Sequence, residues 1–387
     1  MPTMRALVLS YSPIARDPRV RRQIQWLKSK GFEVDAYGLG AAPLVGERTY
    51  TEIRVPSLQS RLRNYLFLSP KKRESLFISS KILSLVQDVQ GNEAYVLAIL
   101  NDLDFLGSDR LFEMFKAKDT NVALDLHEYF YDVGGSVAWR ILHGRYYKWL
   151  LKKLETRTFS QVFTVSEAIG KLYESKLRVP LVALENSPDS KRTNSLVVKS
   201  ENLDSNQKVR LIHHGTFGKG RGIIRLISAM RLIDTRFELH LMVIISTWSK
   251  LFVKALVSIL GLEKRVFLID PVPMSEILRK LSSFDVEVIF YHPPHSTNEL
   301  YSLPNKFFES LASGLAIVVG PSPSMAEIVT EHEIGVVAPS WTRESLANSI
   351  NALTPSAINA AKARTASALA HFDSARVEDK FCNALNI

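Results

Sequence analysis

The stretch 303–320 combines residue types that can bind a polar, anionic molecule. It reads LPNKFFESLASGLAIVVG, so Pro304 begins a predicted helix and Gly314 ends it before a buried strand. Glu309 lies off the apolar face of that helix, where its carboxylate can accept two hydrogen bonds from a ribose diol. The helix start offers free backbone N–H groups to phosphate oxygens, and Lys306 adds a cation. By itself the segment is equally typical of an ordinary helix in an α/β domain.

A second polar segment, HHGTFGKGRG at 213–222, joins a predicted strand to a predicted helix. Its glycines let the backbone approach a diphosphate closely. It is not a Walker A loop, because Gly220 follows Lys219 where that loop needs Ser or Thr. A tight turn without a ligand also explains the glycines, whereas the cations Lys219 and Arg221 favour phosphate binding.

The first half of the chain holds two further polar segments. LDLHEYFYD at 124–132 places His127 at the end of a predicted strand, with Asp125 and Glu128 able to orient its ring. SPIARDPRVRR at 12–22 follows the first predicted strand, and its aspartate can cap the helix that the next proline begins. The alternatives are a structural histidine and a helix cap with solvated arginines.

Short apolar runs alternate with helical stretches along the chain, which indicates parallel sheets covered on both faces. Strands are predicted at 5–10, 33–37, 94–100, 122–126, 161–165, 181–185, 209–213, 239–245, 266–269, 286–291, 316–319 and 336–337. In such sheets ligands bind at the carboxyl ends of the strands. The polar segments at 124–132 and 213–222 follow predicted strands, and the helix at 304–314 lies between two of them.

The pattern breaks once and then restarts, which predicts two domains joined by a linker. A chain of 387 residues is too long for one ordinary core. The predicted division begins with an N-terminal Rossmann-like domain at 1–188 and a Ser/Asn/Lys-rich linker at 189–207. A C-terminal Rossmann-like domain follows at 208–365, and the C-terminal helix at 366–387 is expected to pack back on the N-terminal domain. The fold class is therefore α/β, with two doubly wound sheets facing a cleft.

The net charge of +10 is unevenly distributed. Seven Lys/Arg and one acid lie in 54–81, and six Lys/Arg and one acid lie in 139–158, each with aromatic residues nearby. Such surfaces suit anionic membranes or polyanionic ligands, although solvated helix faces with core aromatics explain them as well. No apolar run approaches the roughly 18–20 residues that span a bilayer. The lone Cys382 fits a reducing compartment, so we expect a cytoplasmic protein, peripheral at the inner face of a membrane.

The order of these segments resembles the family 4 type of retaining glycosyltransferases, which have the GT-B fold. Its P-N-K-x-x-E…A-x-G, D-x-H-E and D-P-R-V-R-R patterns are matched at 304–314, 125–128 and 17–22, and weaker matches extend the resemblance over nearly the whole chain. The resemblance implies transfer of a sugar, with retention, from a UDP- or GDP-sugar to a saccharide or lipid-linked saccharide acceptor. It implies a role in polysaccharide or glycoconjugate synthesis.

The resemblance also implies residue roles. The catalytic group comprises His127, Asp125 and Glu128, with His127 facing the donor sugar. The nucleotide and phosphates are assigned to Gly215, Thr216, Lys219, Arg221, Pro304, Asn305, Lys306 and Glu309. The donor sugar is assigned to Tyr301, Ser302 and Leu303, the base to Asp270 and Val272, and the acceptor side to Arg16, Asp17 and Arg19.

We expect no bound cofactor, no metal and no nucleic-acid partner. His292 and His295 lack a nearby cysteine or carboxylate triad and make a poor metal site. Arg221, Lys306 and a helix N-terminus would instead stabilise the charge of the leaving diphosphate. An anionic membrane surface is a candidate partner besides the donor and acceptor.

Two positions depart from the family pattern. Thr216 stands where an arginine is common, and Tyr301 stands at the first of two glutamates usually separated by seven residues, with Glu299 near but out of register. The departures leave two alternatives open. One is a sugar-nucleotide epimerase on the same fold, and the other is a non-catalytic nucleotide-sugar-binding or scaffold protein.

Overall fold

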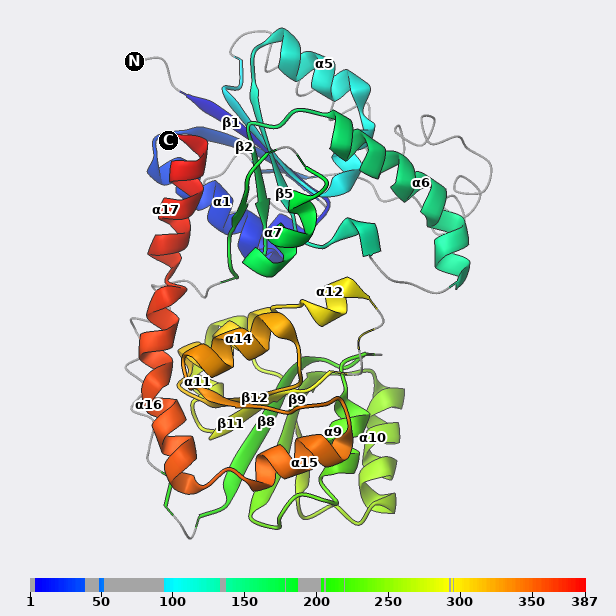
Figure 1. Cartoon of the computed structure of the whole chain (residues 1–387), viewed down its shortest axis with the longest axis vertical. Coiled ribbons are helices and arrows are strands. Elements are labelled where there is room, and N and C mark those ends of the chain that lie inside the picture. Colours follow the sequence, from blue (N-terminus) through cyan, green and yellow to red (C-terminus); the bar gives the residue numbers. More distant parts are fainter. Residues whose placement is uncertain are drawn as a thin grey trace. The chain divides into compact units, whose positions relative to one another are not determined.

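The computed structural model describes most of the chain as two compact units, each with a parallel sheet and surrounding helices (Figure 1). Unit 1 comprises Met1–Glu185 and Glu378–Ile387, and unit 2 comprises Asn186–Val377. The described residues are 4–38, 49–51, 94–132, 137–177, 179–186, 203–204, 207–218, 220–291, 294 and 296–387. The basic stretch 54–81 and most of the predicted linker 189–207 lie outside them.

Unit 1 is built on a seven-stranded parallel sheet in the order β3-β2-β1-β4-β5-β6-β7. The strands are β1 (Arg5–Ser10), β2 (Glu33–Gly38), β3 (Thr49–Thr51), β4 (Leu97–Asn101), β5 (Asn121–Leu126), β6 (Gln161–Thr164) and β7 (Leu181–Ala183). The helices are α1 (Pro18–Ser29), α5 (Asp109–Ala117), α6 (Val137–Thr156) and α7 (Glu167–Glu174), with 3-10 turns η1 (Ile14–Arg16), η2 (Leu103–Gly107) and η3 (Phe130–Asp132). Each strand except β3 lies where the sequence predicts one.

Helix α1 begins where the sequence places its cap. The Asp17 carboxylate accepts hydrogen bonds from the backbone N–H groups of Arg19 and Val20, and Pro18 occupies the first turn. Val20 and Leu27 on the inner face are fully buried. The helix therefore starts at the carboxyl end of β1, next to the position where the strand order changes direction between β1 and β4.

Unit 2 is built on a six-stranded parallel sheet in the order β10-β9-β8-β11-β12-β13. The strands are β8 (Val209–Thr216), β9 (Phe237–Ile244), β10 (Val266–Ile269), β11 (Val286–Ile289), β12 (Ala316–Val319) and β13 (Gly335–Val337). The helices are α9 (Ile223–Ala229), α10 (Thr247–Ile259), α11 (Ile277–Leu281), α12 (Thr297–Leu300), α13 (Asn305–Ala312), α14 (Pro323–Glu331), α15 (Arg343–Asn351) and α16 (Pro355–His371), with a 3-10 turn η4 (Met274–Glu276). The order changes direction between β8 and β11, the position at which such sheets bind ligands.

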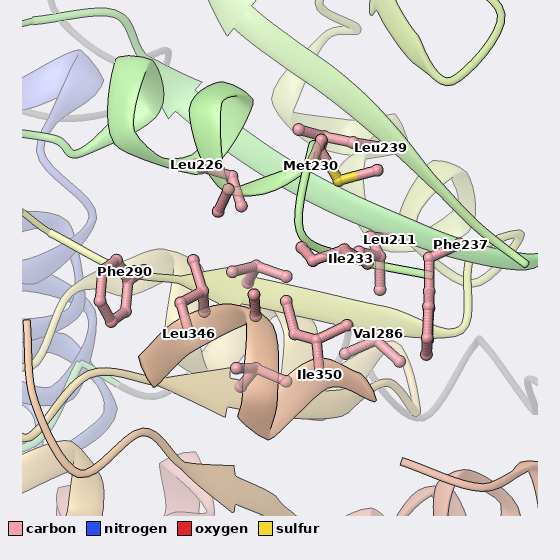
Figure 2. Close-up of a cluster of buried hydrophobic side chains, with 14 of the residues drawn as sticks. Leu211, Leu226, Met230, Ile233, Phe237, Leu239, Val286, Phe290, Leu346 and Ile350 are labelled. Atoms are coloured by element: carbon pink, nitrogen blue, oxygen red, sulfur yellow. The ribbon is translucent and has the colours of Figure 1, made fainter. Parts of the chain in front are cut away.

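One large buried cluster of unit 2 lies between this sheet and the helices on one of its faces (Figure 2), and a second one lies around Phe307 and Phe308 of α13. Leu211 of β8 and Leu239 of β9 belong to the same buried cluster as Leu226 of α9 and Ile350 of α15. Continuous apolar strands are expected when helices cover both faces of a parallel sheet. The predicted α/β class with two doubly wound parallel sheets is confirmed.

The last helix, α17 (Ser374–Leu385), contributes its C-terminal part to unit 1. Phe381 is fully buried there, with its ring 5.1 Å from that of Trp26 and 5.3 Å from that of Phe163. Lys380 pairs with Glu185 at 3.2 Å. The N-terminal unit is thus completed by residues from the far end of the chain.

Candidate functional site

A charged cluster occupies the carboxyl ends of β8 and β11 and the start of α13. Its members are His213, His214, Arg221, Glu287, Tyr291, Lys306 and Glu309. Buried charges are costly unless they are paired and hydrogen-bonded, so a cluster of this kind has to be held by specific contacts.

His214 is held between two carboxylates. Its Nδ1 donates to Glu287 Oε2 at 2.9 Å, and its Nε2 donates to Glu309 Oε2 at 3.0 Å. Both acceptors are carboxylates, so both ring nitrogens carry a proton and the ring is a cation. Burial alone lowers the pKa of His214, but the charge and hydrogen bond of Glu287, joined by Glu309, raise it to about 9. His214 therefore fixes the position of the Glu309 carboxylate.

His213 is neutral and supports Lys306. Its Nδ1 donates to the backbone oxygen of Val288 at 2.7 Å, which leaves Nε2 to accept from Lys306 Nζ at 3.3 Å. Burial lowers the pKa of His213 well below its ordinary value, and the Lys306 charge adds to that effect. Burial also lowers the pKa of Lys306, to about 8, with Arg221 acting in the same direction and Glu287 opposing. Lys306 is thus a buried ammonium that is still mostly charged at neutral pH.

Arg221 and Tyr291 complete the cationic side of the cluster. The guanidinium lies 5.4 Å from the centre of the Tyr291 ring and donates to its hydroxyl at 3.4 Å. Lys306 Nζ lies 5.8 Å from the centre of the same ring. At neutral pH three cations, His214, Lys306 and Arg221, face two carboxylates. The cluster can therefore attract an anion, while the Glu309 side chain, 21% exposed, can accept hydrogen bonds from hydroxyl groups.

The glycine loop makes this geometry possible. A Cβ on Gly215 would lie 3.3 Å from Lys306 Nζ, so the glycine leaves room for the ammonium. Gly222, the N-cap of α9, has a φ of 73°, and a Cβ there would lie within 1.8 Å of the Phe290 backbone oxygen. This close approach of loop and strand requires glycine.

Gly222→Ala should lower the free energy of unfolding by about 3 kcal/mol or more, because a backbone clash is added to a left-handed backbone. The matched control is Gly261→Ala, which has a similar φ of 65° but nothing within 4 Å of the added Cβ. That control should cost only about 1–2 kcal/mol. Denaturant unfolding measures both, and equal losses would show that the contact with Phe290 is not tight.

The other predicted residues of unit 2 lie around this cluster or away from it. Pro304 is the N-cap of α13 and Asn305 its first residue, so the predicted helix start is present. Leu303 is buried, and Ser302 Oγ donates to the Glu299 backbone oxygen at 3.1 Å. Thr216 is exposed at the end of β8, and Tyr301 is the half-buried C-cap of α12. Asp270 pairs with Lys250, and Val272 packs against a buried cluster that includes Ile212 of β8 and Leu281 of α11. Lys219 lies outside the described residues.

Unit 1 holds a second polar network at the carboxyl ends of β4 and β5. The Arg19 guanidinium binds Asp125 through two hydrogen bonds of 2.7 Å, and Gln23 Nε2 donates to the same carboxylate at 2.5 Å. His127 Nε2 lies 3.5 Å from Asp125 Oδ2 and 3.3 Å from Asn101 Oδ1. Burial works against a charged ring, but Asp125 raises the pKa of His127. The structure thus brings His127 and Asp125 together, with Arg19 behind them.

The other predicted residues of unit 1 have the following surroundings. Arg19, which the family pattern assigns to the acceptor side, is 7% exposed, and its guanidinium is held by Asp125 and by the backbone oxygens of Leu184 and Thr164. Glu128 is exposed, and its backbone oxygen accepts from the Tyr173 hydroxyl at 2.7 Å. The Asp17 carboxylate caps α1. The Arg16 side chain lies outside the described residues.

Several residues of the two networks are not predicted by the sequence. Glu287 is fully buried in the middle of β11, within the apolar run VEVIF, and Tyr291 follows the same strand. An acid inside a continuous apolar strand is the signal that could have revealed Glu287. In unit 1, Asp102 has a φ of 119°, accepts from the Tyr11 backbone N–H at 2.7 Å, and has its pKa raised by burial to about 7.

Neither a metal-binding cluster nor a membrane-spanning helix is found among the described residues. No group of three or more His, Cys, Asp or Glu residues is arranged to hold a metal ion in the described part of the chain. None of the described helices has the length and hydropathy needed to cross a bilayer.

The chain is similar to known proteins in part of its sequence and in its fold. Residues 198–367 match the family model described as "Glycosyl transferases group 1". No curated protein matches the chain at a significant level. Sucrose-phosphate synthase from Thermosynechococcus elongatus superposes with a TM-score of 0.72 at 14% identity, over 99% of this chain and 98% of that one.

Two other solved structures have a similar fold. HepE of Anabaena, in complex with UDP and glucose, gives a TM-score of 0.64 at 17% identity over 99% of both chains. Trehalose 6-phosphate synthase from Burkholderia multivorans gives 0.65 at 9% identity over 100% of this chain and 98% of that one. At these identities the likeness concerns the fold alone. Together with the match over residues 198–367, it shows that the chain has the two-domain GT-B fold and that this part of unit 2 is similar to the group 1 glycosyl transferases.

Proposed function

We propose that this protein is a glycosyltransferase that moves a sugar from a nucleoside diphosphate sugar, a UDP- or GDP-sugar, to a saccharide or lipid-linked saccharide acceptor. The observation that carries the proposal is the arrangement in unit 2 of a held carboxylate, Glu309, one turn along α13 from a buried ammonium, Lys306. A ribose diol and a diphosphate are the hydroxyl and anionic parts that such a pair can bind in one molecule. HepE, whose fold is similar and whose structure was solved in complex with UDP and glucose, supports the same donor class.

In this proposal the diphosphate lies between the start of α13 and the glycine loop. Lys306 and Arg221 neutralise its charge, and the first-turn N–H groups at Asn305 add hydrogen bonds. The same groups stabilise the diphosphate as it leaves, when its negative charge grows. Asp270 and Val272 are proposed to border the base, and the segment 301–303 to border the donor sugar.

His127 is proposed to contact the hydroxyls of the donor sugar. Asp125, at 3.5 Å, and Asn101, at 3.3 Å, hold its ring. Retention at the anomeric carbon, membership of family 4 and a role in polysaccharide or glycoconjugate synthesis are proposed from the family resemblance. The proposed location is the cytoplasmic side of a membrane that presents the acceptor.

A panel of nucleotides and nucleotide sugars tests the proposal. We expect UDP- or GDP-sugars to raise the thermal midpoint of the full chain, and slow donor hydrolysis to release the nucleoside diphosphate. A new nucleotide sugar formed from the donor alone, without acceptor, would indicate an epimerase. A chain that no nucleotide stabilises would be a scaffold protein, and either result would refute the proposed transfer.

Transfer is expected to proceed unchanged in excess EDTA, because Lys306 and Arg221 supply the positive charge that a divalent ion would otherwise supply. The measurement compares the initial rate of nucleoside diphosphate release in EDTA with the rate in added magnesium. A rate that falls at least tenfold in EDTA and recovers with magnesium would show that these two side chains do not suffice.

A further inference from the structure

The outward face of α10 in unit 2 is apolar and exposed. Trp248 is 84% exposed and Ile259 is 81% exposed, with Leu251 at 55% and Phe252 at 52% between them. These positions follow the three- and four-residue steps that place side chains on one side of a helix. In the view of Figure 1 the helix lies at the outer margin of unit 2. We call these four side chains the α10 face.

The opposite side of α10 is also apolar, and it packs against the core of unit 2. Val253 and Val257 are buried and belong to the core cluster of unit 2. These two valines already provide the contact between α10 and the core, so the α10 face is a second apolar surface on the same helix. Since an exposed Trp alone presents roughly 200 Å², the α10 face presents several hundred Å². Soluble proteins seldom expose more than this in one patch, and such patches commonly mark interaction sites.

The charges around the α10 face are mostly positive. The segment 244–265 contains four Lys/Arg and one acid. Lys254 on the helix and Lys264 just beyond it are exposed. Lys250 forms an ion pair with Asp270, with Nζ 3.3 Å from Oδ1. An apolar centre with a basic rim fits a partner that has an apolar interior and an anionic outer layer.

A second copy of the chain fits this face poorly. A helix of 13 residues is only about 20 Å long, so even with the several hundred Å² given above its face is smaller than a stable dimer interface. A stable dimer buries roughly 800 Å² on each partner. Two copies joined here would also bring like-charged lysines together. A lipid bilayer needs no matching groove, because side chains of this kind insert singly between headgroups.

We propose that the α10 face binds the surface of an anionic lipid bilayer, with Trp248, Phe252 and Ile259 entering the interface and Lys254 and Lys264 meeting phosphate headgroups. Trp favours this depth because its ring is amphipathic, Phe enters as an apolar side chain, and each lysine near such a surface adds to the attraction. The proposal goes beyond the sugar transfer proposed above and does not depend on it. It assigns membrane contact to unit 2.

Sedimentation of the full chain with vesicles tests the proposal. Vesicles of phosphatidylcholine alone are compared with vesicles that also contain phosphatidylglycerol, at low and at physiological salt. We expect binding to the anionic vesicles, and a partition coefficient at least tenfold lower for the double variant Trp248→Ser, Ile259→Ser. Both side chains are more than four-fifths exposed, so the double variant should fold normally. The matched control is Leu232→Ser, an exposed apolar residue at 45% beyond the end of α9, and it should bind like the wild type.

The other outcomes each contradict the proposal. A wild-type chain that does not sediment with anionic vesicles has no such surface. Unchanged binding by the double variant would assign membrane contact to another part of the chain, for example the basic stretches 54–81 and 139–158. A wild-type dimer that the double variant converts to a monomer, seen by analytical ultracentrifugation, would make the α10 face a protein interface.

A second variant tests the role of the lysines. The pair Lys254→Gln, Lys264→Gln should weaken binding to anionic vesicles only.

Discussion

Replacing Glu309 by alanine should weaken the binding of a nucleoside diphosphate by about 100-fold or more. A carboxylate that accepts two hydrogen bonds from a ribose diol contributes at least ~3 kcal/mol, since each hydrogen bond to a charged group is worth about 1.5 kcal/mol or more. The Glu309 carboxylate is already held by His214 at 3.0 Å, so little ordering is needed on binding. Isothermal titration of wild type and variant with UDP and GDP measures the difference.

Two further variants give this result its meaning. Glu327→Ala removes an exposed glutamate from α14 in the same unit and should leave nucleotide affinity unchanged. Lys306→Met keeps the volume of a buried side chain but removes its charge, so it should weaken binding of the diphosphate and leave binding of the free nucleoside unaltered. Glu309→Ala should weaken both. A folded Glu309→Ala variant with wild-type affinity would contradict its role as the ribose ligand.

The sequence predicts the layers of this fold well, because buried parallel strands are short apolar runs with a local signature. Twelve of the thirteen strands in the described part of the chain lie at predicted positions, and the start of α13 at Pro304 follows from a local helix signal. Only β3, three residues long, carries no such signature. The candidate ligands Lys306 and Glu309 are predictable because they lie on one short helix whose ends are marked by proline and glycine.

The partners of those ligands could not be predicted in the same way, because they are brought together by pairing between distant strands. Glu287 reaches His214 only because β11 pairs with β8, in the register that places Glu287 beside Ile212. Interpreted locally, Arg19 is a solvated arginine in the first turn of a helix, whereas its partner Asp125 lies 106 residues away. In both cases the charged side chain is buried, and a buried charge is stable only when a partner from another strand or helix pairs with it.

Glu287→Gln should lower the free energy of unfolding by about 3 kcal/mol at pH 6.5. The substitution keeps the shape of the side chain but removes the charge that pairs with the His214 cation, and breaking a buried pair typically costs this much. Glu287 is fully buried and lies 2.9 Å from His214 Nδ1, so solvent cannot replace the lost interaction. Denaturant unfolding at fixed pH measures the loss. The control Glu238→Gln, on β9 of the same sheet but only half-buried, should change stability by no more than ~0.5 kcal/mol.

The loss should also depend on pH in one direction. The pKa of His214 is about 9 in the folded chain and about 6.5 in the unfolded chain, so its contribution to stability is complete below about pH 6.5 and disappears as the pH rises through about 9. Glu287 also raises the pKa of Lys306, and that contribution fades over the same alkaline range. The difference between wild type and Glu287→Gln should therefore shrink steadily from pH 6.5 to above pH 9. A difference that stays constant over this range would mean that His214 is not a cation in the folded protein, and that Glu309 is positioned by a neutral hydrogen bond instead.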